Sequence, residues 1–342
     1  MFDINKIVRP NIQSLQAYSS ARDEFTGEEG IFLDANENPY GDLNRYPDPY
    51  QRKLKRKLAE IKGVDADQIF IGNGSDEVID LAMRIFCEPG MDQVLTFEPT
   101  YGMYDVSAEI NNIELIKDPL NENFQIDLDA VLARIQNPLI KLIFICSPNN
   151  PTGNIIPLED IENILKQFNG IVIVDEAYID FSSSKSAISI LQKYPNLIVS
   201  QTFSKARGLA AARVGLAYAS RAIIDLFNKV KPPYNVSLLN QEAAINALEK
   251  EEDHKECMQA IQEEKKNLYD ALNNSDNVTK IYPSEANFYL VEVKDANKIY
   301  NELIDQKVII RNRNKVIRNC IRITVGTAAE NKKLIKALNS IK

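Results

Sequence analysis

The 342-residue sequence is poor in the side chains that bind transition metals. It has one histidine, His254, and four cysteines, Cys87, Cys146, Cys257 and Cys320, which are far apart and form no CxxC pair. So few and so dispersed ligands disfavour a metal site built by the protein. The histidine lies in the charged run EKEEDHKE, which also disfavours a Ser-His-Asp hydrolase. We expect buried free thiols in a reducing cytosol and no metal.

Long apolar runs and an excess of positive charge are also absent. No apolar run approaches the roughly 20 residues that span a bilayer, and the N-terminal stretch MFDINKIVRPNIQSL has no signal or transit pattern. The 40 basic and 48 acidic residues give a net charge of -8, which argues against a broad nucleic-acid surface. The sequence therefore predicts a cytoplasmic protein with neither a membrane nor a nucleic-acid partner.

Short apolar runs alternate with amphipathic stretches between residues 67 and 219. The runs are IFIG, QVLTF, IELI, KLIFIC, IVIVDEAY, NLIVSQTF and VGLAYA, and stretches such as SDEVIDLAMRIF and PLEDIENILKQF, with helical spacing, lie between several of them. This alternation predicts an α/β domain whose sheet is mostly parallel.

The pattern changes after Lys231. Residues 238–273 are predicted to form one long helical region, with room for a kink, that leads to a smaller α+β unit. Strands are expected near NVTKIY, ANFYLVEV, KVII and CIRITVG, and helices around DANKIYNELIDQ and AAENKKLIKAL. We thus predict an arm over residues 1–30 that packs elsewhere, a large domain over 31–237, and a linking helix with a small domain over 238–342.

Polar motifs follow four of the predicted strands, at the edge where open α/β sheets bind ligands. In GNGSDE, the amides of Gly74, Ser75 and Asp76 begin a helix and can face an anion. In SPNNPTG, Asn150 precedes a proline that holds it extended as a neutral donor. Each motif taken alone is equally well explained as an ordinary turn.

The other two motifs carry charge. In DEAY, Asp175 follows a buried strand and needs a cationic partner, either a structural ion pair or a ligand, while Tyr178 can donate to an oxyanion. In TFSKARGLAAARVG, Lys205 follows two hydroxyl residues and precedes Arg213. Most lysines are solvated surface charges. Four such motifs at one sheet edge nevertheless predict a ligand site.

In this combination the motifs resemble the fold type I aminotransferases, which depend on pyridoxal 5'-phosphate (PLP), over nearly the whole chain. The segments LDANENPYG and LNRYPDPY, ahead of GNGSDE, are similar to those of the histidinol-phosphate aminotransferases within that superfamily. The resemblance implies a large domain with a mostly parallel seven-stranded sheet between helices, and a smaller α+β domain. It also implies a homodimer with shared active sites that acts on histidinol phosphate and on glutamate or 2-oxoglutarate in histidine biosynthesis.

The resemblance further implies a role for each matching residue. Lys205 would bind PLP covalently and carry the substrate's proton, and Asp175 would face the pyridine nitrogen. Tyr178 and Asn150 would hydrogen-bond the ring oxygen, and Tyr101 would stack on the ring. The cofactor phosphate would be held by Gly74, Ser75, Asp76, Thr202, Ser204 and Arg213, and by Tyr46 of the neighbouring subunit.

The substrate contacts implied by the resemblance come from both ends of the chain. Arg322 and Arg311 would bind anionic groups together with Tyr18, while Asn36 and Glu37 would line the entrance. Two questions stay open: whether Arg311 or its neighbour Arg313 contacts substrate, and what Arg207 does where the family often has an aromatic residue. An aromatic amino acid aminotransferase and a PLP-dependent decarboxylase of a phosphorylated amino acid remain alternatives, because they share this scaffold. A non-catalytic relative is disfavoured because the lysine, aspartate and phosphate arginine are all present.

Overall fold

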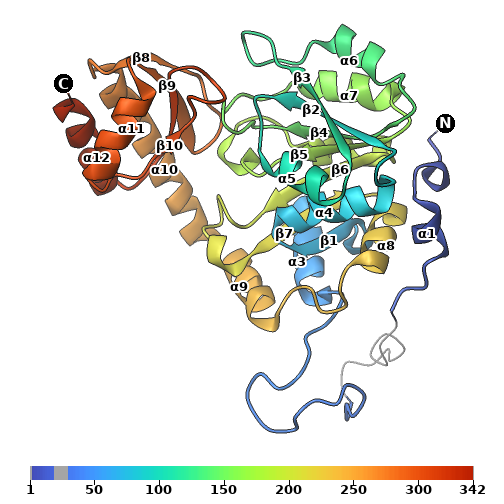
Figure 1. The fold of residues 1–342 in the computed structure, drawn as a ribbon. Coiled ribbons are helices and arrows are strands. Elements are labelled where there is room, and N and C mark those ends of the chain that lie inside the picture. Colours follow the sequence, from blue (N-terminus) through green and yellow to red (C-terminus); the bar gives the residue numbers. More distant parts are fainter. Residues whose placement is uncertain (1, 19–29, 342) are drawn as a thin grey trace.

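The computed structural model describes residues 2–18 and 30–341 (Figure 1). Its larger sheet has seven strands in the order β1-β7-β6-β5-β4-β2-β3. The strands are β1 (Ile69–Asn73), β2 (Gln93–Glu98), β3 (Glu114–Pro119), β4 (Ile140–Cys146), β5 (Ile171–Asp175), β6 (Leu197–Thr202) and β7 (Val214–Ala219). Strands β2 to β6 are mutually parallel, and β7 is antiparallel to both of its neighbours. The predicted α/β fold with a mostly parallel seven-stranded sheet is confirmed.

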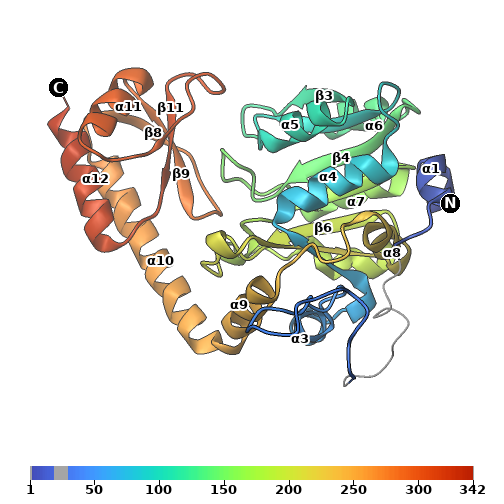
Figure 2. The ribbon, with the colours of Figure 1, turned by 60° about the horizontal axis from the view of Figure 1, so that its bottom comes forward.

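Helices cover both faces of this sheet (Figure 2). One layer contains α3 (Arg52–Lys62), α6 (Leu128–Arg134), α7 (Leu158–Gln167) and α9 (Leu238–Glu249), and the other contains α4 (Ser75–Phe86), α5 (Met103–Ile110) and α8 (Arg221–Val230). Along β5, Val172 and Val174 pack in the first layer, whereas Ile171 and Ile173 pack in the second. Burial on both faces explains why this strand is apolar at every position before Asp175.

The predicted long helical region is divided at Lys250. Its backbone (φ -99°, ψ 55°) separates α9 from α10 (Glu251–Asn273), which leads into the smaller sheet. That sheet is antiparallel, in the order β10-β11-β9-β8. Its elements are β8 (Val278–Ile281), β9 (Phe288–Val293), β10 (Arg311–Asn312) and β11 (Cys320–Thr324), with helices α11 (Ala296–Asp305) and α12 (Ala328–Ser340).

One strand in this unit is shorter than expected and begins later in the chain. The run KVII does not form a strand, and only Arg311 and Asn312 pair with β11. The reason is the end of α11, where Lys307 adopts a φ of +59° and the amide of Val308 bonds back to the carbonyl of Leu303. The chain is still leaving the helix where the strand was expected.

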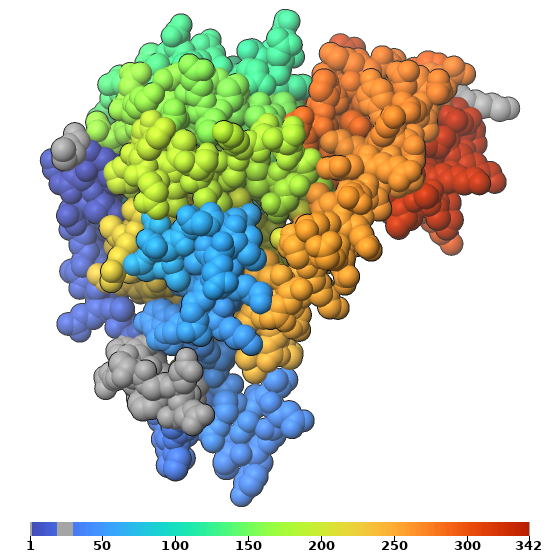
Figure 3. Space-filling model, turned by 180° about the vertical axis from the view of Figure 1, so that it is seen from behind, coloured from blue at the N-terminus to red at the C-terminus, as the bar shows by residue number. Residues whose placement is uncertain are grey.

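The two parts of the N-terminal region differ in their packing. The short elements η1 (Ile4–Lys6) and α1 (Pro10–Ser14) lie against the large domain, where Val8 and Ile12 are buried in the core layer of α4 and α8. Residues 31–50 instead project from the body of the molecule (Figure 3). No helix among the described residues is long and apolar enough to cross a membrane. The domain boundaries at residues 30 and 237 stay predictions.

Candidate active site

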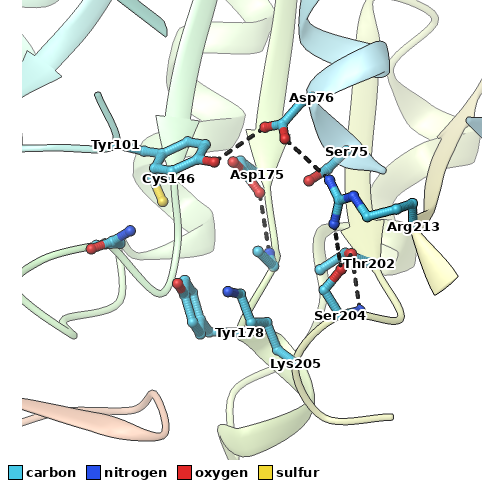
Figure 4. Close-up of a pocket in the computed structure, with 12 residues that line it drawn as sticks. Ser75, Asp76, Tyr101, Cys146, Asp175, Tyr178, Thr202, Ser204, Lys205 and Arg213 are labelled. Atoms are coloured by element: carbon cyan, nitrogen blue, oxygen red, sulfur yellow. Dashed lines mark hydrogen bonds and ion pairs between the residues drawn. The ribbon is translucent and has the colours of Figure 1, made fainter. Parts of the chain in front are cut away.

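A cavity opens at the carboxyl edge of the larger sheet (Figure 4). It encloses about 480 Å³ including its open mouth. Its lining residues come from the ends of several strands and the loops after them: Ser75, Asp76, Tyr101, Cys146, Asn150, Asp175, Ala177, Tyr178, Thr202, Ser204, Lys205 and Arg213. All four polar motifs of the sequence therefore meet in one place, as expected for the strand ends of an open α/β sheet.

Asp175 ends β5 and is almost fully buried, with 2% of its surface exposed. Its Oδ2 accepts a hydrogen bond from the Tyr104 hydroxyl at 2.8 Å, and its Oδ1 accepts one from the Ala177 amide at 3.2 Å. Burial raises the pKa of this carboxyl to about 6. Among the described residues no basic side chain forms a salt bridge with Asp175, so the structural ion pair considered from the sequence is not formed. The carboxylate is placed to receive a cationic ligand group.

Lys205 and Tyr178 lie side by side in the cavity. The Lys205 Nζ lies 5.6 Å from the centroid of the Tyr178 ring, and Figure 4 shows the amine pointing into the cavity. Burial, followed by the positive charges of Arg322 and Arg213, lowers the pKa of the Lys205 amine from its ordinary value. Burial also raises the pKa of the Tyr178 phenol, which keeps it a hydrogen-bond donor. Tyr178 packs edge-on against Phe288 of β9, so the small domain supports this wall.

The first turn of α4 forms the opposite wall. Its N-cap is Gly74, with a φ of +82°, and no side chain caps the free amides. A Cβ atom at Gly74 would lie 2.5 Å from the Arg213 Nη2, so a larger residue would displace the guanidinium. Arg213 donates to the Ser204 Oγ and ion-pairs with Asp76, both at 3.4 Å, and Thr202 hydrogen-bonds Ser204 at 3.0 Å. Free amides, hydroxyls and a guanidinium together form a site for a phosphate.

Gly215 allows strand β7 to pass close to the turn that begins α4. A Cβ atom there would lie 2.1 Å from the carbonyl carbon of Gly74, so only glycine lets β7 pass the turn that begins α4. Two residues earlier, Arg213 has a left-handed backbone with a φ of +51°, a conformation that costs on the order of 1–3 kcal/mol and is found at functional sites. The last glycine of TFSKARGLAAARVG thus brings the arginine beside the helix terminus.

Tyr104 was missed by the sequence reasoning. It is fully buried, is stacked on Phe144 with ring centroids 4.7 Å apart, and donates to Asp175. Tyr101, which was predicted, lines the cavity, and its hydroxyl donates to Asp76 Oδ1 at 3.1 Å. The available signal was the segment YGMY, which puts a second tyrosine three residues after the first.

The small domain contributes arginines to the edge of the cavity. Asn150 Oδ1 accepts hydrogen bonds from the Arg322 Nη1 and, at 3.5 Å, from the Arg313 Nη2. This leaves the side-chain amide of Asn150 as the donor that the sequence predicted. Arg311 pairs with Arg322 in the β10–β11 register but is exposed. The structure therefore brings Arg313, rather than Arg311, to Asn150.

Four predicted residues of the N-terminal region lie outside this cavity within one chain. Asn36, Glu37 and Tyr46 line a separate cavity, where Tyr46 stacks on Tyr234 with ring centroids 4.3 Å apart. Tyr18 is 71% exposed. These residues belong to the N-terminal region ahead of α3, and within the same chain they do not line the cavity of Lys205.

Arg207, whose role the sequence left open, has a structural partner. Its Nη1 ion-pairs with the Glu251 Oε2 at 2.9 Å, and only 14% of the arginine side chain is exposed. Glu251 is the first residue of α10. The ion pair therefore ties the loop after Lys205 to the base of the helix that carries the small domain.

The side chains that line the cavity fit PLP. Asp175 is a buried carboxylate without a salt bridge, the Gly74 turn and Arg213 form an anion cradle, and Lys205 is an amine of lowered pKa that points between them. These three groups match the ring nitrogen, the phosphate and the aldehyde of that cofactor.

Comparison with known proteins agrees with this geometry. The family model described as aminotransferase class I and II matches residues 31–338. The histidinol-phosphate aminotransferase of Cytophaga hutchinsonii is 50% identical to the chain, over 99% of each protein. That of Christiangramia forsetii is 52% identical, over 99% of this chain and 98% of its own.

Solved structures of the same group share the fold. The histidinol-phosphate aminotransferase of Sinorhizobium meliloti, in complex with pyridoxal-5'-phosphate, is similar with a TM-score of 0.82 and 28% identity, covering 88% of this chain and 84% of its own. That of Clostridium acetobutylicum has a TM-score of 0.80 and 25% identity, over 87% and 91% of the two chains. The chain belongs to the class I and II aminotransferases, which depend on PLP, and within them to the histidinol-phosphate aminotransferases.

Proposed function

We propose that the chain transfers an amino group between histidinol phosphate and 2-oxoglutarate, giving imidazole acetol phosphate and glutamate, in the cytoplasm. The observation that carries the proposal is the meeting of Lys205, Asp175 and Arg213 at one cavity. The relatives named histidinol-phosphate aminotransferase, half identical over their whole length, support this choice of substrate.

In this proposal the chain holds the cofactor at three points. Lys205 would bind it covalently, Asp175 would keep its ring nitrogen protonated, and Arg213 would contact its phosphate. The amides of Ser75 and Asp76 and the hydroxyls of Thr202 and Ser204 complete the phosphate site. When bound, PLP supplies an electron-accepting ring that stabilises negative charge at the substrate carbon.

Proton transfer is assigned to Lys205. An ordinary lysine has a pKa near 10.4 and is a poor base at neutral pH. Burial and the charges of Arg322 and Arg213 lower the pKa of this amine, which brings it closer to the range that suits a general base. Tyr178 and Asn150 would donate hydrogen bonds to the ring oxygen.

A homodimer with shared sites is part of the proposal. Ile31, Leu33 and Tyr40 are 92%, 86% and 83% exposed in the single chain, and exposed apolar residues gathered in one segment mark interaction surfaces. A second copy of the chain would cover them and receive Tyr46 at its own cofactor phosphate. Asn36, Glu37 and Tyr18 would then line the entrance, with Arg311 and Arg322 as substrate contacts.

A single-turnover experiment tests the proposed reaction and separates it from decarboxylation. Purified holoenzyme is mixed with histidinol phosphate alone, and we expect one equivalent of imidazole acetol phosphate per site. Addition of 2-oxoglutarate then restores the starting absorption spectrum and releases glutamate. Histidinol phosphate carries no carboxylate, so decarboxylation is tested in a separate reaction with an O-phosphorylated amino acid. Release of carbon dioxide there, or no ketone product from histidinol phosphate, contradicts the proposal.

A further inference from the structure

Glu176, the residue after Asp175, carries a second buried carboxyl group. Only 3% of its surface is exposed, it does not line the cavity, and no basic side chain in the described part of the chain forms a salt bridge with it. We infer that Glu176 is a positioning residue, which fixes the loop of Tyr178 and the end of β6 relative to Asp175. The inference rests on the proposed function, because it adds a residue to the site that would carry the reaction.

Three neutral donors surround the Glu176 carboxyl group. Its Oε1 accepts a hydrogen bond from the Ala187 amide at 2.6 Å. Its Oε2 accepts one from the Ser186 hydroxyl at 2.6 Å and one from the Gln201 side-chain amide at 2.8 Å. Ala187 and Gln201 are buried as well. Hydrogen bonds in such a buried network are stronger than in water and rigidify the segments that they join.

Two of these bonds close the loop that carries Tyr178. Glu176 directly follows β5, and the chain comes back to it at Ser186, which is the N-cap of η4 (Ala187–Lys193). The Ser186 hydroxyl and the Ala187 amide therefore fasten the far end of the loop to its first residue. Tyr178 lies between these two points, so the closure restricts where its ring can lie.

The third bond joins the ends of two neighbouring strands. In the β5–β6 register Asp175 pairs with Ser200, and the Glu176 amide donates to the Ser200 carbonyl at 2.8 Å. The side-chain bond from Gln201 to Glu176 extends this pairing by one residue. Thr202, which lines the cavity, follows directly on β6. Glu176 thus links the strand of the buried Asp175 carboxylate to the strand that leads to the phosphate cradle.

Glu176 faces away from the cavity. Its partner Ala187 packs in the same core layer as Tyr218 of β7, beneath α3 and α7. Tyr104, which donates to Asp175, packs in the opposite layer. The side chains of Asp175 and Glu176 hence lie on opposite faces of the sheet, and Glu176 acts on the cofactor site through the segments that it joins rather than by contact.

The network tolerates a neutral side chain at this position. Burial raises the pKa of Glu176 to about 7, although its hydrogen bonds and the charge of Lys62 on α3 act in the opposite direction. A neutral group needs an acceptor among its neighbours. The Ser186 hydroxyl accepts as well as donates, and the Gln201 amide can turn to present its oxygen. Glutamine at position 176 should therefore preserve the connection, whereas alanine removes it.

The first test compares Glu176→Ala and Glu176→Gln with Glu60→Gln in the holoenzyme. Glu60 is exposed on α3, so its variant removes one negative charge away from the network. We expect Glu176→Ala to lower kcat about 10- to 100-fold, as a small misplacement of reacting groups does. The KM values for both substrates should stay within about threefold, because no substrate contact is lost. Glu176→Gln should keep most of the wild-type kcat, and Glu60→Gln all of it.

Visible circular dichroism of the bound cofactor gives a second readout that needs no substrate. The signal depends on the asymmetric surroundings of the bound ring, so we expect Glu176→Ala to lose most of it per bound cofactor and Glu176→Gln to keep it. Urea denaturation measures stability separately. A merely structural role would lower stability but leave the dichroism and the kcat of the folded protein unchanged.

Gln201→Ala carries both tests if Glu176→Ala does not fold, because it breaks the same link from the other side. If both variants fold, their effects on kcat should be less than additive. A dichroism signal and a kcat within about twofold of the wild type in the folded alanine variant overturn the inference. A loss in Glu176→Gln as large as in Glu176→Ala overturns it as well. If the wild type does not act on histidinol phosphate, the proposed function fails, and the dichroism still tests Glu176.

Discussion

Replacement of Asp175 by asparagine should change how the stability of the cofactor-free protein depends on pH. Burial raises the pKa of this carboxyl from 3.8 to about 6. Between these two values the folded protein holds a proton that the unfolded chain releases, so stability is lost as pH rises through the pKa of the folded state. Asp175→Asn removes this titration while retaining the size of the side chain.

The size of the expected stability change follows from the pKa shift of Asp175. About two pKa units correspond to about 3 kcal/mol of unfolding free energy, lost between about pH 4 and pH 7. Glu176 is also buried, and its pKa is raised to about 7, which gives a slope of the same sign. Because both proteins contain Glu176, its contribution cancels in the difference between them.

Urea denaturation of the two cofactor-free proteins at pH 4.5 and pH 7.5 measures this effect. We expect the wild type to lose about 2 kcal/mol relative to Asp175→Asn over that range. With the cofactor bound, the same variant should turn over about 100-fold more slowly or worse, because one partner of a buried charge pair is missing. Equal pH slopes for the two proteins, or a loss of turnover below about tenfold, would refute the assignment of Asp175.

Three further variants test the remaining assignments. Lys205→Ala should abolish the visible absorption of covalently bound cofactor, and a wild-type spectrum would show that another amine binds it. Tyr46→Phe should weaken cofactor retention in a dialysis assay. Mixing Tyr46→Phe subunits with Lys205→Ala subunits should restore some activity if sites are shared between chains. No restoration would mean that each chain supplies its own tyrosine. Arg207→Gln should lower the unfolding free energy in urea by less than about 1 kcal/mol, as expected for a partly exposed ion pair with Glu251. Its turnover should stay within about threefold of the wild type, and a loss above about tenfold would indicate a role in the reaction.

The sequence was sufficient for the sheet and its polar edge because both depend on local patterns. Each apolar run between residues 67 and 219 forms a strand, and parallel strands bring their carboxyl ends to one edge. The break at Lys250 and the missing strand at KVII were less predictable, since both depend on how a helix ends. Helix ends are the least certain part of a pattern-based prediction.

The contacts between distant segments could not be predicted from the pattern. Tyr104 looks like any core tyrosine in the sequence, and only its burial beside β5 shows that it donates to Asp175. Arg313 and Arg311 are equally placed in sequence, and the two-residue strand β10 decides which of them reaches Asn150. Arg207 likewise needed the start of α10 to reveal its partner.

Amino transfer from histidinol phosphate is tested most directly by comparing kcat/KM for several amino donors with 2-oxoglutarate as acceptor. We expect purified holoenzyme to use histidinol phosphate at least about 100-fold more efficiently than phenylalanine or tyrosine. Equal or greater efficiency with an aromatic amino acid would contradict it.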